Sequence, residues 1–189
     1  MSKKLILFIG APGSGKTTDG RNIAEKHSNI THYSTGELLK AESEKETKLG
    51  KIEKAFISRG DLVPTDIVID TIVEAIRNAP TDIILLDGFP RKEKQMKFFG
   101  DCLHNVEGIE LNAVIEIQVS EDTGRQRFLE NGGSNEIFDA EMKIYKSTIN
   151  EIEEFYKQND LITIIDGERD SSIVINELDD FLQQKVALL

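Results

Sequence analysis

Gly10-Ala11-Pro12-Gly13-Ser14-Gly15-Lys16-Thr17 is the stretch of this 189-residue chain that decides its fold. It carries every fixed position of the pattern GxxxxGK[ST]. The apolar run 5–9 before it predicts a buried strand, and the segment 17–27 after it predicts a helix. In such a strand-to-helix turn, glycines let backbone N–H groups close on phosphate oxygens, and the helix N-terminus adds positive potential. The pattern and its flanks therefore indicate a phosphate-binding loop rather than a Gly-rich turn without a ligand.

The residue types in this loop suggest how it would hold a nucleotide. Backbone groups around Gly13, Ser14 and Gly15 would surround the phosphates, and the Lys16 ammonium would reach the β- and γ-phosphates. A hydroxyl group on Thr17 or Thr18 would approach Mg²⁺ or a phosphate oxygen.

The composition describes a globular protein with a sizeable core. Hydrophobic residues make up 39% and charged residues 30% of the chain, and the net charge is −11. So acidic a surface repels nucleic-acid backbones, although a few cations can still dominate a cleft and bind a small anion. No apolar run approaches the roughly 18 residues of a membrane span. Cys102 is the single cysteine, so we expect it to pack in a helix and we expect a reducing, cytoplasmic location.

Apolar runs and helical periodicities alternate along the chain. Strands are predicted at 5–9, 30–33, 82–86, 113–119 and 161–165. Helices are predicted at 17–27, from 35 towards 45, at 49–58, from 66 to about 78, at 92–105, from 120 to 130, at 135–159 and at 171–186. Ser34 and Glu37 fit a capping box before the second helix. This alternation predicts an α/β fold of the P-loop type, with a five-stranded parallel sheet between two helical layers in a single domain, 1–189.

Asp87-Gly88-Phe89-Pro90-Arg91 directly follows the apolar strand 82–86. Ligands of parallel α/β sheets bind beyond the carboxyl ends of the strands, so Asp87 and Arg91 are candidates for chemistry. Taken alone, Asp87 could equally be a turn former and Arg91 a surface side chain.

Four motifs in order resemble the adenylate kinase family. They are GAPGSGKTT at 10–18, HYSTGELLK at 32–40, GDLVP at 60–64 and DGFPRKEKQ at 87–95. The resemblance covers nearly the whole chain, and it implies in-line phosphoryl transfer between ATP and AMP to give two ADP, with Mg²⁺ and without a covalent intermediate. It also implies ATP, AMP and ADP as partners, no nucleic acid, no membrane and a monomer.

The resemblance also implies roles for individual residues. The implied ATP-binding residues are Gly13, Ser14, Gly15, Lys16, Thr17, Thr18, Arg127 and Arg169. The implied AMP-binding residues are Thr35, Gly36, Lys40, Asp61, Leu62, Val63, Gly88, Phe89, Pro90, Arg91 and Gln95. The implied catalytic residues are Lys16, Asp87, Arg91 and Arg127, and Mg²⁺ would lie near Thr17, Thr18 and Asp87, held mostly through water. The implied organisation is a core of 1–33, 64–130 and 136–189, an AMP-binding region at 34–63 and a residual lid loop at 131–135.

Three of these roles have a specific chemistry. Gln95 would read the adenine edge of AMP, because an amide offers a donor and an acceptor together. Arg91 would bridge the AMP phosphate and the phosphoryl group in transfer, which suits a bidentate guanidinium. Arg127 would lie against the ATP adenine, and the backbone near Arg169 would close the same pocket.

The sequence departs from the family pattern in two places. Thr17 stands where Gly is common, although Thr18 keeps the family's hydroxyl. Lys40 replaces the usual Arg, so the charge is kept and the bidentate fork is lost.

A larger departure concerns the lid that closes over ATP in the family. Only 131–135 remains of it, Asn131 takes the place of one phosphate-binding Arg, and Glu141 takes the place of another. The Arg of the lid loop has no counterpart. Arg125, Lys143 and Lys146 are nearby candidates to substitute.

Two other functions stay open at this point. One is a kinase for UMP or CMP, against which Thr35 and Gln95 argue. The other is a nucleotide-binding or scaffold protein that kept the cleft and lost turnover, for which the missing arginines argue.

Overall fold

All five strands form one parallel sheet in the order β2-β3-β1-β4-β5. The structure is a computed structural model that describes residues 2–57, 63–105 and 108–186. The strands are β1 (Lys3–Gly10), β2 (Ile30–Ser34), β3 (Ile83–Asp87), β4 (Ile109–Gln118) and β5 (Ile162–Asp166). The predicted fold class is confirmed, and β4 begins four residues earlier than its apolar run indicated.

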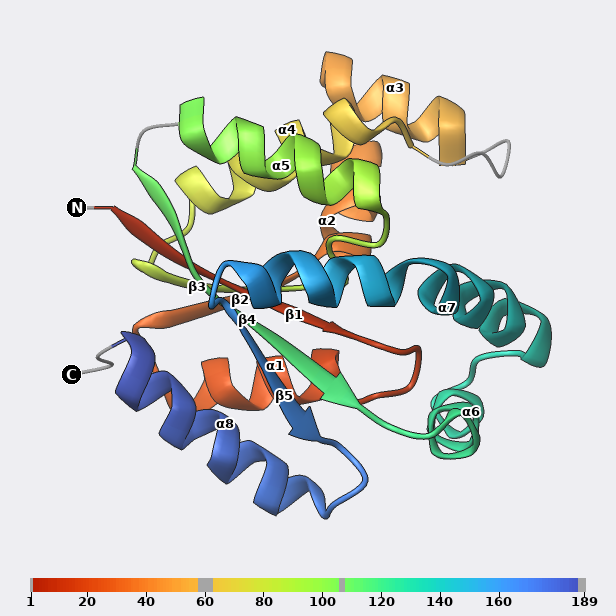
Figure 1. The fold of residues 1–189 in the computed structure, drawn as a ribbon. Coiled ribbons are helices and arrows are strands. Elements are labelled where there is room, and N and C mark those ends of the chain that lie inside the picture. Colours follow the sequence, from red (N-terminus) through yellow and green to blue (C-terminus); the bar gives the residue numbers. More distant parts are fainter. Residues whose placement is uncertain (1, 58–62, 106–107, 187–189) are drawn as a thin grey trace.

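Helices cover both faces of the sheet. They are α1 (Lys16–Lys26), α2 (Thr35–Ser43), α3 (Lys48–Ile57), α4 (Thr65–Arg77), α5 (Glu93–Asn105), α6 (Glu121–Glu130), α7 (Asn135–Gln158) and α8 (Ser171–Val186). Figure 1 shows α1 and α8 on one face and α4, α5 and α7 on the other, with α3 projecting beyond the sheet. Within the described residues, no helix is both long enough and apolar enough to span a bilayer.

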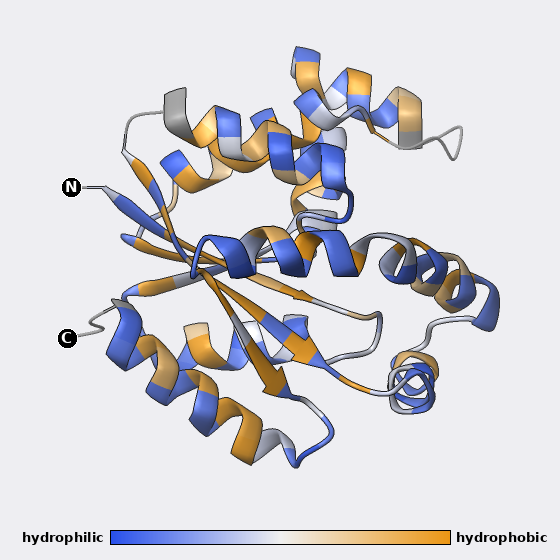
Figure 2. Cartoon of the chain, viewed as in Figure 1, coloured by the Kyte–Doolittle hydropathy of each residue, from blue (hydrophilic) through white to orange (hydrophobic). Residues whose placement is uncertain are grey.

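The central strand explains why the apolar runs are continuous. Leu5, Leu7 and Ile9 of β1 pack into the core beneath α4, α5 and α7, whereas Ile6 and Phe8 pack into the core beneath α1 and α8. Because successive side chains point to opposite faces, a strand buried on both faces needs apolar residues at every position. In Figure 2 the inner strands are accordingly mostly orange, and the helices carry blue outward faces.

Serine side chains cap two helices of the described chain, but not the helix for which a capping box was expected. Ser34 precedes α2, but its side chain makes no capping hydrogen bond, and Glu37 pairs with Arg21 of α1 instead. The expected capping box is therefore wrong. Ser120 and Ser134 do cap, since their hydroxyl oxygens accept from backbone N–H groups at the starts of α6 and α7.

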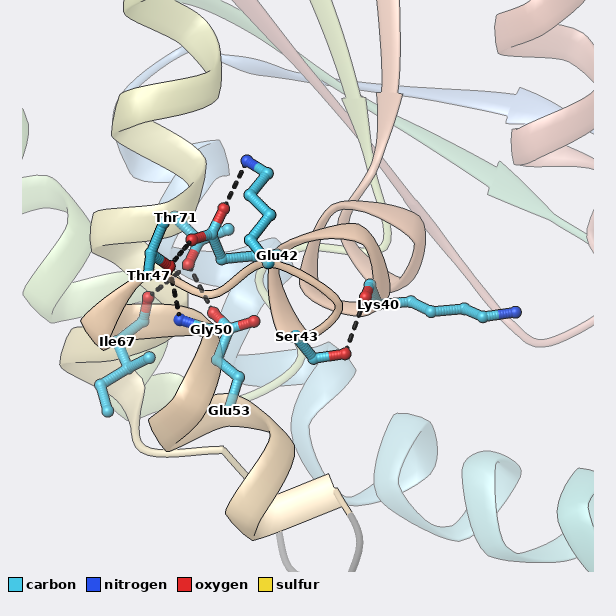
Figure 3. Close-up of polar contacts among 9 residues, drawn as sticks. Lys40, Glu42, Ser43, Thr47, Gly50, Glu53, Ile67 and Thr71 are labelled. Atoms are coloured by element: carbon cyan, nitrogen blue, oxygen red, sulfur yellow. Dashed lines mark hydrogen bonds and ion pairs between the residues drawn. The ribbon is translucent and has the colours of Figure 1, made fainter.

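A buried carboxylate ties α2 to the start of α3. Glu42 is 6% exposed, and it accepts hydrogen bonds from the Lys45 ammonium at 2.5 Å and the Thr47 hydroxyl at 2.6 Å. The Thr47 oxygen in turn accepts from the backbone N–H of Gly50 at 2.9 Å. These contacts, shown in Figure 3, satisfy the first turn of α3 and hold the Glu42 pKa below its ordinary value.

A second carboxylate joins α3 to α4 and is less well satisfied. Glu53 is fully buried, and its Oε1 accepts from the Thr71 hydroxyl of α4 at 2.6 Å. Its Oε2 has no hydrogen-bond partner within the described part of the chain. Burial raises the pKa of Glu53, and the nearby Glu42 carboxylate raises it further.

We predict that Glu53→Gln stabilises the protein more at pH 8 than at pH 5. The folded-state pKa of Glu53 lies above the ordinary value of 4.5. The wild-type protein therefore loses stability as pH rises from 4.5 through the folded-state pKa. The side-chain amide of the variant does not titrate, so the variant is spared this loss. Each unit of pKa elevation is worth about 1.4 kcal/mol. Thermal unfolding at several pH values measures the effect. The exposed Glu44→Gln serves as control, and a pH-independent difference for Glu53→Gln would contradict the prediction.

Candidate functional site

The loop at 10–17 joins β1 to α1 and lies directly against α6. Gly13 and Gly15 have φ of 76° and 98°, in the left-handed region that favours glycine. A Cβ atom on Gly13 would lie 2.0 Å from the carbonyl oxygen of Gly124, and one on Gly124 would lie 2.8 Å from the carbonyl oxygen of Pro12. Two glycines far apart in sequence therefore allow the close approach of the loop and α6.

Lys16 lies where three other charged side chains converge. Its ammonium donates to the backbone carbonyl of Ala11 at 3.2 Å, which folds the side chain back over the loop. Burial lowers the pKa of Lys16 and Arg91 lowers it too, whereas the Asp87 and Glu141 carboxylates raise it. The Lys16 ammonium therefore lies near Asp87 at the end of β3, Arg91 in the segment after β3 and Glu141 of α7.

Asp87 ends β3 and is 2% exposed. One carboxylate oxygen accepts from the Thr17 hydroxyl at 3.2 Å, and the other lies 2.6 Å from Nε2 of His32 on β2. Its backbone carbonyl accepts from the Thr35 hydroxyl at 2.8 Å. A Cβ atom on Gly20 would lie 2.5 Å from the His32 ring, so this glycine lets α1 cover the pair. Asp87 is therefore a fixed carboxylate and not a free turn residue.

Two hollows meet at the carboxyl ends of the strands. The larger, of about 560 Å³, is lined by the predicted ATP-side residues Gly13, Ser14, Gly15, Lys16, Thr17, Thr18, Arg127 and Arg169, together with Asp87 and Arg91. The smaller, of about 50 Å³, is lined by Gly88, Phe89, Pro90 and Arg91 of the predicted AMP side and also by Lys16. Lys16, Arg91 and Glu141 line both hollows.

Two arginines line the larger hollow away from the loop. Arg127 of α6 donates to the backbone carbonyl of Gly167 at 2.9 Å. Arg169 donates to the backbone carbonyl of Asp166 at 3.1 Å and pairs with Glu177 of α8. These contacts hold both guanidinium groups at the end of β5, at the edge of the cavity where the resemblance expects the ATP base.

The predicted ATP-side residues all line one hollow, but only some of the predicted AMP-side residues line the other. Arg91 donates from Nε to the carbonyl of Gly88 at 3.1 Å, and its backbone N–H donates to Oε1 of Gln95 at 2.7 Å. The Gln95 oxygen and the Thr35 hydroxyl are therefore both engaged within the protein. Figure 3 shows the exposed Lys40 side chain extending away from the cluster around Glu42.

The other predicted AMP-side residues lie either away from the two hollows or outside the described part of the chain. Gly36 at the start of α2 and Val63 before α4 line neither hollow. Asp61 and Leu62 lie outside the described residues.

The cations considered as substitutes for lid arginines lie elsewhere. Arg125 pairs with Glu121 at 3.1 Å and with Asp139 at 2.7 Å, and Lys146 also pairs with Glu121. Lys143 lies beside them in a separate surface hollow. Within the part of the chain that is described, none of these three side chains lines the two hollows at the strand ends.

Sequence reasoning missed a polar pair beneath the smaller hollow. The Tyr145 hydroxyl of α7 donates to the fully buried Glu116 of β4 at 2.9 Å. Burial raises the pKa of Glu116 to about 7. A Glu within the mostly apolar run 113–119 was the available signal, but its partner lies 29 residues away. His32 and Gly124 were missed for the same reason.

The parallel sheet, the glycine loop and the cation-lined hollows define a P-loop α/β protein that binds nucleotide phosphates. A protein-family model described as adenylate kinase matches residues 8–161. An adenylate kinase of a Nitratiruptor species is 48% identical over 97% of both chains. One of a Sulfurovum species is 45% identical over 97% of this chain and all of its own, and one of Campylobacter jejuni serotype O:2 is 46% identical over 96% and 97%. The chain belongs to the adenylate kinase family, a family of phosphotransferase enzymes.

We predict that Gly13→Ala abolishes measurable nucleotide binding and that Gly132→Ala does not. Both glycines have a left-handed φ, 76° and 85°, so the backbone strain is matched. Only at Gly13 would the added Cβ meet a backbone atom, whereas at Gly132 nothing lies within 4 Å. Titration calorimetry with ATP measures the difference, and circular dichroism verifies folding. Equal loss in both variants would contradict the close packing of the loop against Gly124.

Proposed function

We propose that this protein transfers a phosphoryl group reversibly between ATP and AMP to give two ADP. The observation that carries the proposal is that Lys16 and Arg91 line both hollows, so they lie at the junction of a phosphate-loop cavity and a second one. A donor in the larger hollow and an acceptor phosphate beside the segment 88–91 would both meet these two cations. The smaller hollow, of about 50 Å³, would not hold a whole nucleotide. Membership in the adenylate kinase family supports this assignment.

The chemistry needs positioning and charge neutralisation more than covalent catalysis. The loop N–H groups and Lys16 would hold the donor phosphates, and Arg91 would contact the acceptor phosphate and the transferring group. Attack would be in line, without a phosphorylated protein group. Arg127 and Arg169 would frame the donor base at the far edge of the larger hollow.

The residues present fit a magnesium ion bound with the nucleotide. Asp87 and Thr17 supply oxygen atoms 3.2 Å apart in the wall of the larger hollow. Within the described residues, no cluster of three or more His, Cys, Asp or Glu side chains forms a protein-only metal cage. That combination suits Mg²⁺, which keeps several waters and binds through one or two carboxylates plus phosphates. When bound, the ion would neutralise charge that develops on the phosphate oxygens.

A second candidate, a nucleotide-binding protein with weak turnover, is favoured by one observation. Residues 131–134 are the whole connection between α6 and α7, and Glu141 lies in the cleft where a further cation would help. Fewer cations and poorer exclusion of water would slow transfer and leave binding intact.

We expect a coupled assay of ATP plus AMP to show ADP formation, with kcat/KM about 5- to 150-fold higher for AMP than for UMP or CMP. Gln95 and Thr35 are the proposed readers of adenine. The Gln95 oxygen and the Thr35 hydroxyl already have partners within the protein, so adenine would pair with the amide N–H₂ group of Gln95. An acceptor base that leaves this group unpaired in the complex costs roughly 1–3 kcal/mol. Equal values for the three acceptors would contradict the adenine assignment. ATP binding without ADP formation would favour the second candidate.

We also predict that Lys16→Met reduces turnover at least about 100-fold while the thermal midpoint stays within a few degrees. The substitution keeps a long side chain but removes the charge proposed to contact the β- and γ-phosphates, and a group that stabilises transferring charge is worth about 2.7–4 kcal/mol. Lys143→Met, which removes a lysine of α7 outside the two hollows, is the matched control. Near wild-type turnover in Lys16→Met would exclude the assigned ATP site.

A further inference from the structure

Glu141 is an acidic side chain beside two cations of the proposed site, Lys16 and Arg91. It lies in the first half of α7, and its Oε1 is 3.9 Å from a terminal guanidinium nitrogen of Arg91. It lines both hollows, and its carboxylate acts on the ammonium group of Lys16. Phosphate groups drawn to Lys16 and Arg91 therefore meet a negative charge beside them.

The second carboxylate at this junction, Asp87, is differently placed. It is buried and held by His32 and Thr17. The Glu141 side chain is 35% exposed, and its ion pair with Arg91, whose side chain is 50% exposed, is long. The Glu141 carboxylate at the rim of the hollow is partly exposed and makes no short ion pair with Arg91, so it can act on a charge that enters the hollow.

We propose that Glu141 is a specificity-determining residue that makes the cleft favour a nucleotide polyphosphate carrying a divalent cation over the metal-free polyphosphate. Repulsion between the carboxylate and the phosphates grows with the phosphate charge. A bound divalent cation removes two of those charges, and its water ligands can donate hydrogen bonds to a nearby carboxylate. Glu141 also competes for Arg91, so a ligand must replace an existing ion pair. The inference rests on the proposed use of this cleft for nucleotide phosphates.

The test measures binding of ATP alone, without an acceptor, by titration calorimetry on the full chain. Each protein is titrated once with excess Mg²⁺ and once with a chelator. For Glu141→Gln we expect metal-free ATP to bind about fivefold more tightly and the Mg²⁺ complex to change about twofold or less, as removal of a partly exposed charge implies. The preference for the metal complex then falls about threefold.

Glu154→Gln is the matched control. It removes one negative charge from the same helix, about 20 Å further along at 1.5 Å per residue, where Glu154 contacts Gln158. We expect the preference in this variant to equal that of the wild type. A general effect of the net charge would change both variants alike and would overturn the proposal.

The remaining outcomes also decide the question. An unchanged or increased preference in Glu141→Gln overturns the role of Glu141 and leaves the proposed function standing, provided that ATP binds. Failure of the wild-type chain to bind ATP in either condition removes both proposals. If Glu141→Gln does not fold, Glu141→Ala replaces it, and if neither folds, the residue is structural and the proposal is wrong.

Discussion

Much of the site depends on the burial of one carboxylate, Asp87. A buried carboxylate is tolerated only when it is paired or hydrogen-bonded, and here the partners come from elements far apart in sequence. His32 brings β2, Thr17 brings α1, and the Asp87 carbonyl anchors Thr35 at the start of α2. Satisfying this group therefore fixes the phosphate loop relative to the end of β3. It also fixes where α2 leaves the sheet. The position of one side of the cleft relative to the other is therefore determined.

The cleft and the chain as a whole differ in the sign of their charge. The chain carries a net charge of −11, so a polyanion gains nothing by approaching it at random. Lys16, Arg91, Arg127 and Arg169 line one hollow and create a local attraction that the surrounding charge confines. The Glu141 carboxylate at the rim of this hollow offsets part of that attraction near Lys16 and Arg91. If the cleft is used as proposed, this balance favours a small ligand of limited charge over a large polyanion.

The sequence predicts what is encoded locally and fails where distant residues meet. The fixed glycine and lysine pattern, the two-sided apolar runs and the helical periodicities predicted the parallel α/β class and the loop, because each signal is complete within a few residues. His32 and Gly124 were not recognised, since their meaning comes from Asp87, 55 residues away, and from Gly13. The capping box at Ser34 was wrong because Arg21, on another helix, attracts Glu37. The strand order, which brings β3 beside β1, has no local signal.

The packing of α6 and α7 bears on how the cleft could close. Gly133 lies against Phe128, where an added Cβ would approach the ring to 2.2 Å, and Phe128 meets Phe138 edge-on at 5.6 Å between ring centroids. Aromatic packing therefore holds the connection 131–134 in place. The close approach at Gly124 holds α6 against the phosphate loop. A segment so short and so tightly packed cannot swing over a triphosphate without losing these contacts. On the other side of the cleft, the polar contacts of Glu42 join α2 to the start of α3, and that of Glu53 joins α3 to α4. Leu38 and Leu39 of α2 also pack against the core, so both sides of the cleft are held by contacts that a closing motion would have to preserve or replace.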